Sequence, residues 1–434
     1  MANYGKSAGG DAAAFTRALS RTAKYLWIGD SQGSPLTHDL TDGNQGIRIP
    51  FGIRKNWDRD WTYMTHPGSY GSIAAGTSLV RNATDVGAAP SVTTPGTNLV
   101  TGTGVNQLQP QDVIEMTWVA NAAAGANPGS MYIRLAQTGS MTYYNGSNWY
   151  DGQTLRGKII YADAVYGTGY DPLGVGGIRS TVGAETGFTP SGDATLKAVD
   201  VAIPDHASAE ASVHVKGGAN NEATKPMHLA VCGGMIYKAS GSNLVDGAGW
   251  DTISQPGFTP YDHLTGYDDL AIGRWLSLTV APSTIFMMFG HNAEADDFSG
   301  NSVTQAAKDR YDRLIGRAIV GAAYARNIQA VTYPTDIFII IPWLASTSGG
   351  MPNVTKATNV RNAWIDVAER RGVNWISLYD YFGQQNPLAN SSHLHPNATG
   401  GVANTDIRTI VTGLESCLRS RVTSRYPRLR NRGR

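Results

Sequence analysis

Four short apolar runs alternate with segments of helical periodicity, and this alternation constrains the fold more than any other feature of the sequence. The apolar runs are residues 25–28, 283–289, 336–342 and 375–378. Helical spacing is visible at residues 11–23, 261–278, 303–325, 354–371 and 399–419. Strands that are apolar throughout are typical of a parallel sheet with helices on both faces. The sequence therefore predicts an α/β core, in which functional residues gather at the carboxyl ends of the strands.

The stretch between residues 76 and 239 has a different pattern. Short β-favouring runs follow one another without a helical period between them, at residues 112–120, 130–136, 141–144, 155–165, 198–203 and 211–215. Such spacing, with Gly, Asn, Pro and Ser turns, is typical of an antiparallel β-sandwich. We therefore predict a discontinuous α/β domain over 1–75 and 240–420, an inserted β-rich domain over 76–239, and a basic C-terminal tail over 421–434. Glycan contact is one interpretation of the inserted domain.

Composition narrows the class of protein. The 434 residues are 41% hydrophobic and 16% charged, with a formal net charge of +1. This balance argues against nucleic acid or anionic lipid as a general partner. No run approaches the roughly 18 apolar residues of a membrane span. The two cysteines, Cys232 and Cys417, do not make a disulfide framework.

The N-terminal residues carry no uninterrupted apolar core of the secretory type, so we expect no signal peptide. The compartment stays unknown, and a virion-borne or non-classically exported chain remains open. The basic tail is interpreted either as a solvated segment or as a contact with an acidic surface of a larger assembly.

The first apolar run stops abruptly at Gly29, Asp30 and Ser31, within the sequence KYLWIGDSQG. A glycine lets the chain turn sharply at this point. A buried strand that ends in a tight turn under a serine is what nucleophilic catalysis needs. The same three residues are also an ordinary turn composition, so the role of Ser31 depends on whether distant partners exist.

Two later segments supply such partners. The apolar run at 283–289 continues into Gly290, His291 and Asn292. Near the C-terminus, residues 390–400 read NSSHLHPNATG, in which a loop histidine is followed by proline and asparagine. A histidine whose ring pKa lies near 6.5 can accept a serine proton at neutral pH.

These three segments resemble the motifs of the SGNH/GDSL hydrolase family of esterases and lipases. Gly29-Asp30-Ser31 matches its first block, Gly290-His291-Asn292 its third, and the histidine at 395 with its Pro-Asn its fifth. The resemblance implies a flavodoxin-like three-layer α/β/α core. It also implies a serine nucleophile at Ser31, a general base at His395 and an oxyanion donor at Asn292. No metal or organic cofactor is implied.

The second block of the family is a glycine in a turn after the second strand. Gly249, within residues 246–252, fits it best by position, and Gly241 is the fallback. On this assignment the oxyanion is held by the backbone N–H groups of Ser31 and Gly249 and by the side chain of Asn292.

One position departs from the family pattern. An aspartate usually stands three residues before the base and orients its imidazole, whereas this chain has Ser392 there. Three explanations stay open: a backbone carbonyl near Ser392 orients the ring, another carboxylate such as Asp296 or Asp297 approaches, or the site is degenerate. His393 is a lesser candidate for the base, because no Pro-Asn follows it.

Two further features have alternative interpretations. Residues 48–63 are rich in aromatic and charged side chains, and they either pack over the sheet or form a rim that contacts the substrate. His291 either packs in the core or touches the acyl pocket.

The leading hypothesis for function is a serine esterase that removes O-acetyl groups from a polysaccharide, with an acetylated glycan as its partner. The alternative is a phage-virion or cell-surface protein that binds a glycan or receptor and carries a vestigial or secondary hydrolase site. A homo-oligomer or a place in a virion assembly is compatible with either hypothesis.

Overall fold

Five parallel strands form the centre of the molecule. The structure is a computed structural model that describes residues 4–6, 12–30, 32–33, 49, 52–53, 57, 59–67, 91–93, 114–118, 130–136, 154–163, 176–180, 186–188, 196–203, 211–216, 227–254, 258–267, 269–292, 294–344, 353–387 and 405–423. In chain order the five strands are β2 (Lys24–Gly29), β14 (Ala248–Ser254), β15 (Thr284–Met288), β18 (Asp336–Ile341) and β19 (Asn374–Ser377). They lie side by side as β14-β2-β15-β18-β19, all parallel. Counted among themselves along the chain, these five strands have the order 2-1-3-4-5 of flavodoxin-like sheets. A sixth parallel strand, β3 (Trp61–Pro67), lies beside β14. The predicted parallel α/β core is confirmed.

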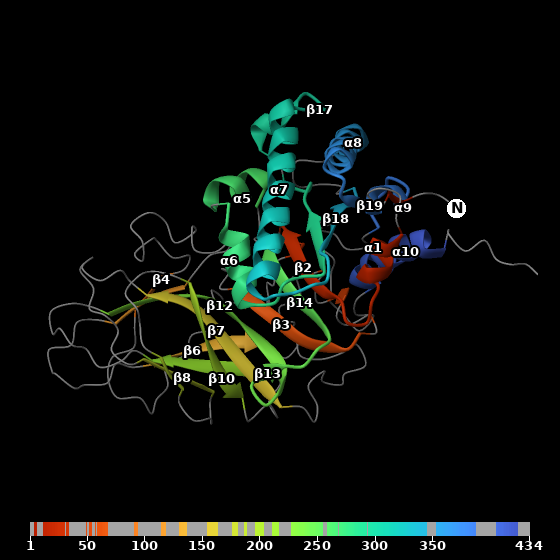
Figure 1. The fold of residues 1–434 in the computed structure, drawn as a ribbon. Helices are drawn as coiled ribbons and strands as arrows, with labels where there is room; N and C mark the ends of the chain where they lie inside the picture. Colours follow the sequence, from red (N-terminus) through yellow and green to blue (C-terminus); the bar gives the residue numbers. More distant parts are fainter. Residues whose placement is uncertain are drawn as a thin grey trace, which may run out of the picture.

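Helices cover both faces of this sheet (Figure 1). One face carries α5 (Pro260–Gly266), α6 (Ala271–Leu278), α7 (Gln305–Ile328) and α8 (Val354–Arg371), and the other carries α1 (Ala13–Ala18) and α10 (Thr405–Thr423). Alternate side chains of β2 divide between the two faces, because Tyr25 and Trp27 pack with α1 and α10 whereas Leu26 and Ile28 pack with the other helices. The core is therefore a three-layer sandwich.

The long helices begin and end where local chemistry predicts. The side chain of Thr304 accepts a hydrogen bond from the Ala307 N–H in the first turn of α7, and that of Asn353 accepts one from the Lys356 N–H in the first turn of α8. The helix α8 ends at Gly372, which is in the left-handed region. The expected helix at 354–371 matches α8, and the one at 303–325 matches α7 to within three residues. The expected helix at 399–419 overlaps α10, whose first described residue is Thr405. No helix in the described part of the chain is long and apolar enough to cross a bilayer.

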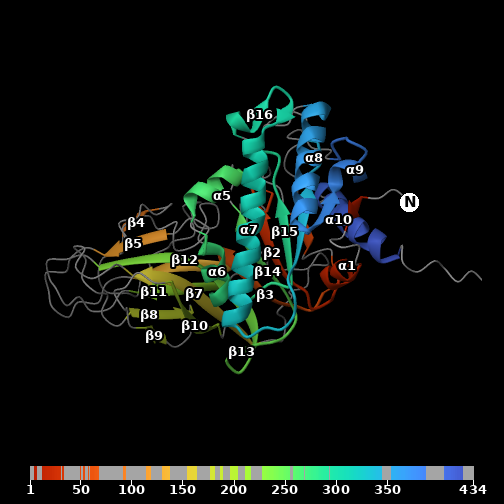
Figure 2. The same ribbon diagram turned by 45° about the horizontal axis from the view of Figure 1, so that its top comes forward.

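The β-rich region continues the same sheet. β3 (Trp61–Pro67) pairs in parallel with β14 and antiparallel with β12 (Met227–Ser240), which in turn pairs with further antiparallel strands (Figure 2). The strands β5 (Ile114–Trp118), β7 (Leu155–Asp163) and β13 (Asn243–Leu244) pair with β12 directly. Further out, β4 (Ser91–Thr93) pairs with β5, and β10 (Lys197–Ile203) pairs with β7.

A second antiparallel sheet has the order β6-β11-β8-β9 among the described residues. Its strands are β6 (Ser130–Ala136), β8 (Gly176–Ser180), β9 (Thr186–Phe188) and β11 (Ala211–Lys216). The expected strands at 130–136, 155–165, 198–203 and 211–215 coincide with elements of these two sheets, and the one at 141–144 lies outside the described residues. The inserted β-sandwich and the domain boundaries at 75, 239 and 420 stay predictions.

Three short elements complete the described chain. β1 (Gly5–Lys6) pairs with β19, and β16 (Phe298–Ser299) pairs with β17 (Ser302–Val303) after the short 3₁₀ helix η3 (Ala295–Asp297). The helical turn α9 (Leu378–Tyr381) follows β19 directly.

The interpretation of residues 48–63 as an exposed substrate rim is wrong for the large aromatic side chains that the structure describes there. Trp57 and Trp61 are 3% and 1% exposed, and Tyr63 is equally buried. The reason is that Trp61 and Tyr63 belong to β3, which is enclosed between β14 and β12. Arg59 is also buried, and its guanidinium lies over the Trp57 ring. The alternative interpretation, packing against the sheet, is confirmed for these residues.

Candidate active site

The carboxyl ends of three neighbouring strands meet at one edge of the core sheet. Gly29, the last residue of β2, stands opposite Ser254 at the end of β14 and opposite Met288 at the end of β15. The strand order reverses at this point, because β14 lies on one side of β2 and the next strand in the chain, β15, lies on the other. Ligands of open α/β sheets bind at such a switch point.

A tight turn follows β2 at this edge. The backbone N–H of Gly33 donates to the Asp30 carbonyl at 3.2 Å, and the Gln32 N–H donates to the Asp30 carboxylate at 2.9 Å. The Thr252 hydroxyl of β14 donates to the Gly33 carbonyl at 2.8 Å, which ties the turn to the neighbouring strand. Asp30 is 1% exposed, so its side chain serves the backbone of the turn rather than solvent. Ser31, the expected nucleophile, lies outside the described residues.

Gly29 is required by close packing. A Cβ atom at this position would lie 2.6 Å from the Met288 carbonyl oxygen and 3.0 Å from Trp27 Nε1. Real Cβ atoms do not approach a backbone oxygen so closely, so a larger residue would separate β2 from β15 at the start of the turn.

Asn292 follows β15 and reaches toward the segment after β14. Its Nδ2 donates to the Phe258 carbonyl at 3.4 Å, and its side chain is half-buried. The preceding Gly290 has φ of +131°, a backbone conformation that favours glycine. The expected oxyanion donor therefore stands at the same sheet edge as the turn after β2.

The assignment of Gly249 as the second oxyanion donor is wrong. Gly249 pairs with Lys24, at the amino end of β2, whereas Gly29 at the other end of that strand pairs with Ser254. Residues 246–252 are not a turn after the second strand, because Ala248–Ser254 is itself that strand and is buried throughout. A Cβ atom on Gly249 would lie 1.7 Å from the ring of Tyr63, so the glycine makes room for that ring. Gly241, the fallback, lies even earlier, in the turn between β12 and β13.

The base and its surroundings lie outside the described residues: Ser392, His393 and His395 all do. The two carboxylates considered as orienting groups are already engaged with Arg310 of α7. Arg310 contacts Asp296 at 3.0 Å and Asp297 at 2.6 Å, and Asp297 also accepts the Glu294 N–H at 2.8 Å. The Arg310 guanidinium holds the pKa of Asp296 below its usual value.

His291 packs in the core, as one of its two interpretations predicted. It is 1% exposed, lies edge-on to Trp343 at 4.9 Å, and directs Nε2 to the Trp343 carbonyl at 3.1 Å. Since a carbonyl oxygen only accepts, Nε2 carries the proton. Burial lowers the pKa of His291 to about 4, so the ring is neutral near pH 7.

A second buried histidine at this edge was missed in the sequence. His263 of α5 is 2% exposed, and its Nε2 lies 3.2 Å from the carbonyl oxygen of Gly29. Burial lowers the pKa of His263 to about 4 as well. One local signal was available: Thr259 and Asp262 form a capping box that starts the helix immediately after β14 and so brings its first turn to this edge.

Below the edge lies a buried carboxylate that belongs to the scaffold. Asp251, in the middle of β14, is 0% exposed and accepts hydrogen bonds from Thr65 at 2.6 Å, Trp275 at 2.9 Å and Thr279 at 2.7 Å. Burial raises the pKa of Asp251 even though these three donors oppose the rise. The carboxyl joins β14 to β3 and α6.

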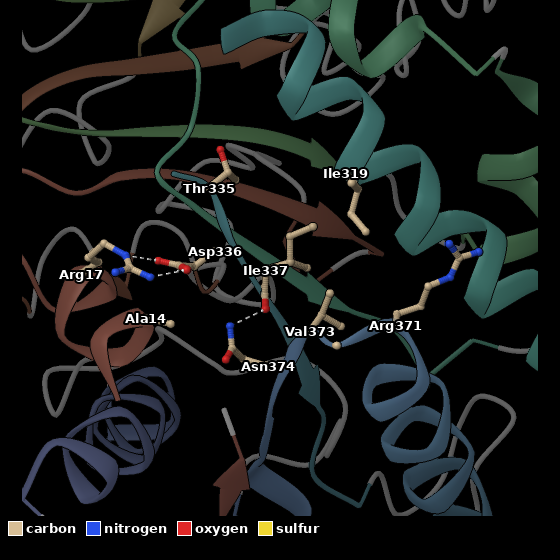
Figure 3. Close-up of a pocket in the computed structure, with 10 residues that line it drawn as sticks. Ala14, Arg17, Ile319, Thr335, Asp336, Ile337, Arg371, Val373 and Asn374 are labelled. Carbon is tan, nitrogen blue, oxygen red and sulfur yellow. Dashed lines mark hydrogen bonds and ion pairs between the residues drawn. The ribbon is translucent and has the colours of Figure 1, made fainter. Parts of the chain in front are cut away.

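The opposite edge of the sheet holds a cavity of about 320 Å³ (Figure 3). Arg17 and Asp336 at its mouth form a two-pronged ion pair at 2.6 and 2.8 Å, and Asn374 donates to the Ile337 carbonyl at 3.0 Å. Because this cavity lies at the amino ends of β18 and β19, it is separate from the candidate site at the carboxyl ends of β2, β14 and β15. Among the residues that the structure describes, no three His, Cys, Asp or Glu side chains gather as a metal site.

The chain is similar in fold to a solved peptidoglycan O-acetylesterase, with a TM-score of 0.51 and 12% sequence identity over 96% of this chain and 99% of that chain. The likeness shows a shared fold, a mainly parallel sheet flanked by helices. A solved acetyl xylan esterase from the rumen bacterium Butyrivibrio proteoclasticus also matches, with a TM-score of 0.22 and 9% identity over 71% of this chain and 96% of that one, but so low a score carries no weight. The sequence matches no family model and no curated protein.

Proposed function

We propose that this chain is a serine esterase of the SGNH type that removes O-acetyl groups from a polysaccharide. The observation that carries the proposal is the meeting of the Asp30–Gly33 turn and Asn292 at adjacent strand ends of a 2-1-3-4-5 sheet. The sequence places a serine inside that turn, at position 31.

The proposed reaction proceeds through an acyl-enzyme. His395 takes the proton from Ser31 Oγ as this oxygen bonds to the acetyl carbonyl carbon, and the carbonyl oxygen becomes an oxyanion. When the intermediate collapses, the bond to the sugar oxygen breaks and that oxygen receives the proton from His395. Water, deprotonated by the same histidine, then releases acetate and restores Ser31. No step requires a metal or an organic cofactor.

The oxyanion donors are revised from those expected. The Ser31 N–H and the Asn292 side chain keep their roles. In place of Gly249 we assign Gly257, the first glycine after β14, which adjoins the residue that Asn292 contacts. One such donor typically contributes about 3–4 kcal/mol of transition-state stabilisation.

The orienting group for His395 follows from the same proposal. Arg310 already binds Asp296 and Asp297. The backbone carbonyl or side chain at Ser392 is therefore the favoured acceptor for the imidazole N–H. An orienting group of this kind keeps the ring in the tautomer that can accept the serine proton.

The polysaccharide part of the proposal has two supports. A solved structure that matches over 96% of this chain, with a TM-score of 0.51, is a peptidoglycan O-acetylesterase. The β-rich region adds a large surface beside the core, which suits an extended substrate.

The proposal is tested with wild type, Ser31→Ala and a control variant, Ser277→Ala, whose native hydroxyl donates to the Arg274 carbonyl on α6. We expect p-nitrophenyl acetate hydrolysis, fluorophosphonate labelling and acetate release from O-acetylated polysaccharides in wild type and control. All three should be lost in Ser31→Ala. Binding of acetylated glycan without Ser31-dependent turnover would instead support the glycan-binding alternative.

A further inference from the structure

One buried side chain, His263, contacts all three strand-end segments of the candidate site. Its Nε2 lies 3.2 Å from the Gly29 carbonyl at the end of β2. Its ring lies edge-on to Phe258, after β14, and to Phe289, after β15, with 5.2 Å between ring centroids in both pairs. Phe258 is also the residue whose carbonyl accepts from Asn292.

We propose that His263 is a positioning residue, which holds the Gly29 peptide in the orientation that the following nucleophile turn requires. The inference rests on the proposed esterase function, since it assigns a role in the same site.

The hydrogen bond runs in one direction only. The Gly29 oxygen is a backbone carbonyl and can only accept, so His263 Nε2 carries the proton and donates it. His263 therefore acts as a fixed donor rather than as a proton carrier, in contrast to the role assigned to His395.

The helix that carries His263 is held from several sides. The capping box of Thr259 and Asp262 starts α5, and the Thr259 hydroxyl also lies 3.0 Å from the Glu294 carboxylate, two residues after Asn292. At the other end of α5, Arg317 of α7 donates to the His263 and Tyr267 carbonyls at 2.9 and 2.8 Å.

The hydrogen bond from His263 to the Gly29 carbonyl connects α5 to the turn that holds the proposed nucleophile. Gly29 ends β2, and the next residue, Asp30, accepts the two hydrogen bonds that shape the turn. If the carbonyl loses the His263 donor, the Gly29–Asp30 peptide is held less firmly, and the turn that it starts can shift. Small displacements of a reacting group are costly, about 100-fold for 1 Å.

The test compares two substitutions at this position. His263→Phe keeps an aromatic ring among Phe258, Tyr267 and Phe289 but removes the N–H. His263→Gln restores an N–H donor of similar reach. Asn374→Leu is the matched control: Asn374 is 4% exposed, and its Nδ2 donates to a strand carbonyl at the opposite edge of the sheet (Figure 3).

With p-nitrophenyl acetate, we expect His263→Phe to lower kcat about 10- to 100-fold while KM stays within about two-fold. His263→Gln should recover kcat to within a few-fold of wild type. Asn374→Leu should keep wild-type kcat although it also loses a buried hydrogen bond. Unfolding midpoints measured on the same samples show whether activity follows stability.

Two results would overturn the inference. Wild-type kcat in His263→Phe would show that the donor is not needed. An equal loss in both His263 variants, in step with their unfolding midpoints, would reduce His263 to a structural residue. If wild type itself shows no Ser31-dependent turnover, the proposed function fails and the inference falls with it, a result distinguishable from the other two.

Discussion

Gly29 and Met288 face each other at the carboxyl ends of β2 and β15, so closely that a Cβ atom on Gly29 would lie 2.6 Å from the Met288 carbonyl oxygen. The contact joins the strand that precedes the proposed nucleophile to the strand that precedes the proposed oxyanion donor. The spacing of these two strand ends is therefore set by the absence of a side chain at position 29.

We expect Gly29→Ala to destabilise the protein by about 1–3 kcal/mol, because the added methyl group forces the strand ends apart. Hydrolysis of p-nitrophenyl acetate should fall by more than the lost stability explains. The control is Gly316→Ala in α7, where the nearest atom to a new Cβ is an Arg371 side-chain nitrogen at 3.6 Å. An alanine inside a helix is favoured over glycine, so this variant should be stabilised slightly. Equal urea-unfolding midpoints for the two variants would contradict the prediction.

Replacing Asn292 with alanine should lower kcat about 100- to 1,000-fold with little change in KM, since an oxyanion donor acts mainly in the transition state. Asn359→Ala is a matched control, because Asn359 also donates Nδ2 to a backbone carbonyl, that of Asn301, but on the exposed face of α8. Steady-state kinetics on both variants check the prediction. A rise in KM alone for Asn292→Ala would assign this side chain to substrate binding instead.

Because His263 and His291 are buried, we expect the folded protein to lose stability in mild acid. Burial lowers the pKa of His263 and of His291 from 6.5 to about 4. A depressed histidine pKa means that the unfolded chain binds the proton more readily than the folded one. The stabilising contribution is therefore fully present above about pH 6.5 and is lost as the pH falls through 4, by about 3 kcal/mol for each histidine.

This acid dependence is checked by urea unfolding between pH 4 and 7.5 with wild type and the double variant His263→Gln/His291→Gln. The difference in unfolding free energy between the two proteins should narrow as the pH falls. Curves that stay parallel over this range would show that neither histidine is kept neutral by the fold.

Substitution of Asp251 should lower the free energy of unfolding more than substitution at most other positions. Asp251→Ala leaves the buried donors of Thr65, Trp275 and Thr279 without their acceptor, so we expect a loss of at least about 3 kcal/mol. Asp251→Asn keeps an acceptor oxygen and should lose less. Chemical denaturation of both variants measures the difference, and equal losses would show that the volume of the side chain matters more than its oxygens.

The same pair also tests the sign of a pKa shift. Burial raises the pKa of Asp251 above 3.8, so wild-type stability falls as the pH rises from 3.8 through the raised value. Asparagine does not titrate, so the disadvantage of Asp251→Asn should shrink with rising pH. A disadvantage that grows with pH would mean that the folded protein favours the charged carboxylate.

Local patterns were sufficient to predict β2, β15, β18 and β19, but not β14. Short apolar runs such as 283–289 and 336–342, rich in β-branched and aromatic residues, indicate buried strands. The helical period at 354–371 matches α8, because periodicity and capping act within one element. The pairing order of the strands followed from the resemblance to the family, not from the runs themselves.

Tertiary contacts explain what could not be predicted. Residues 246–252 contain two glycines and resemble a turn, but Gly249 exists to admit the ring of Tyr63 from a strand almost 190 residues earlier in the chain. The mixed aromatic and charged sequence around Trp61 concealed β3 for a similar reason, since both of its partners come from later in the chain. The capping box before His263 indicates where α5 begins, but nothing nearby in the sequence indicates that the His263 ring meets the carbonyl of Gly29.

The position of β3 between β14 and β12 means that hydrogen-bonded strands run without a break from β19 to β4. Removing residues 76–239 would therefore expose unpaired backbone N–H and C=O groups along β3. Strands of other chains can pair with such an exposed edge. The shortened protein should therefore aggregate unless that edge were covered. The strands that pair with β3 thus protect an edge that the core sheet alone would expose to solvent.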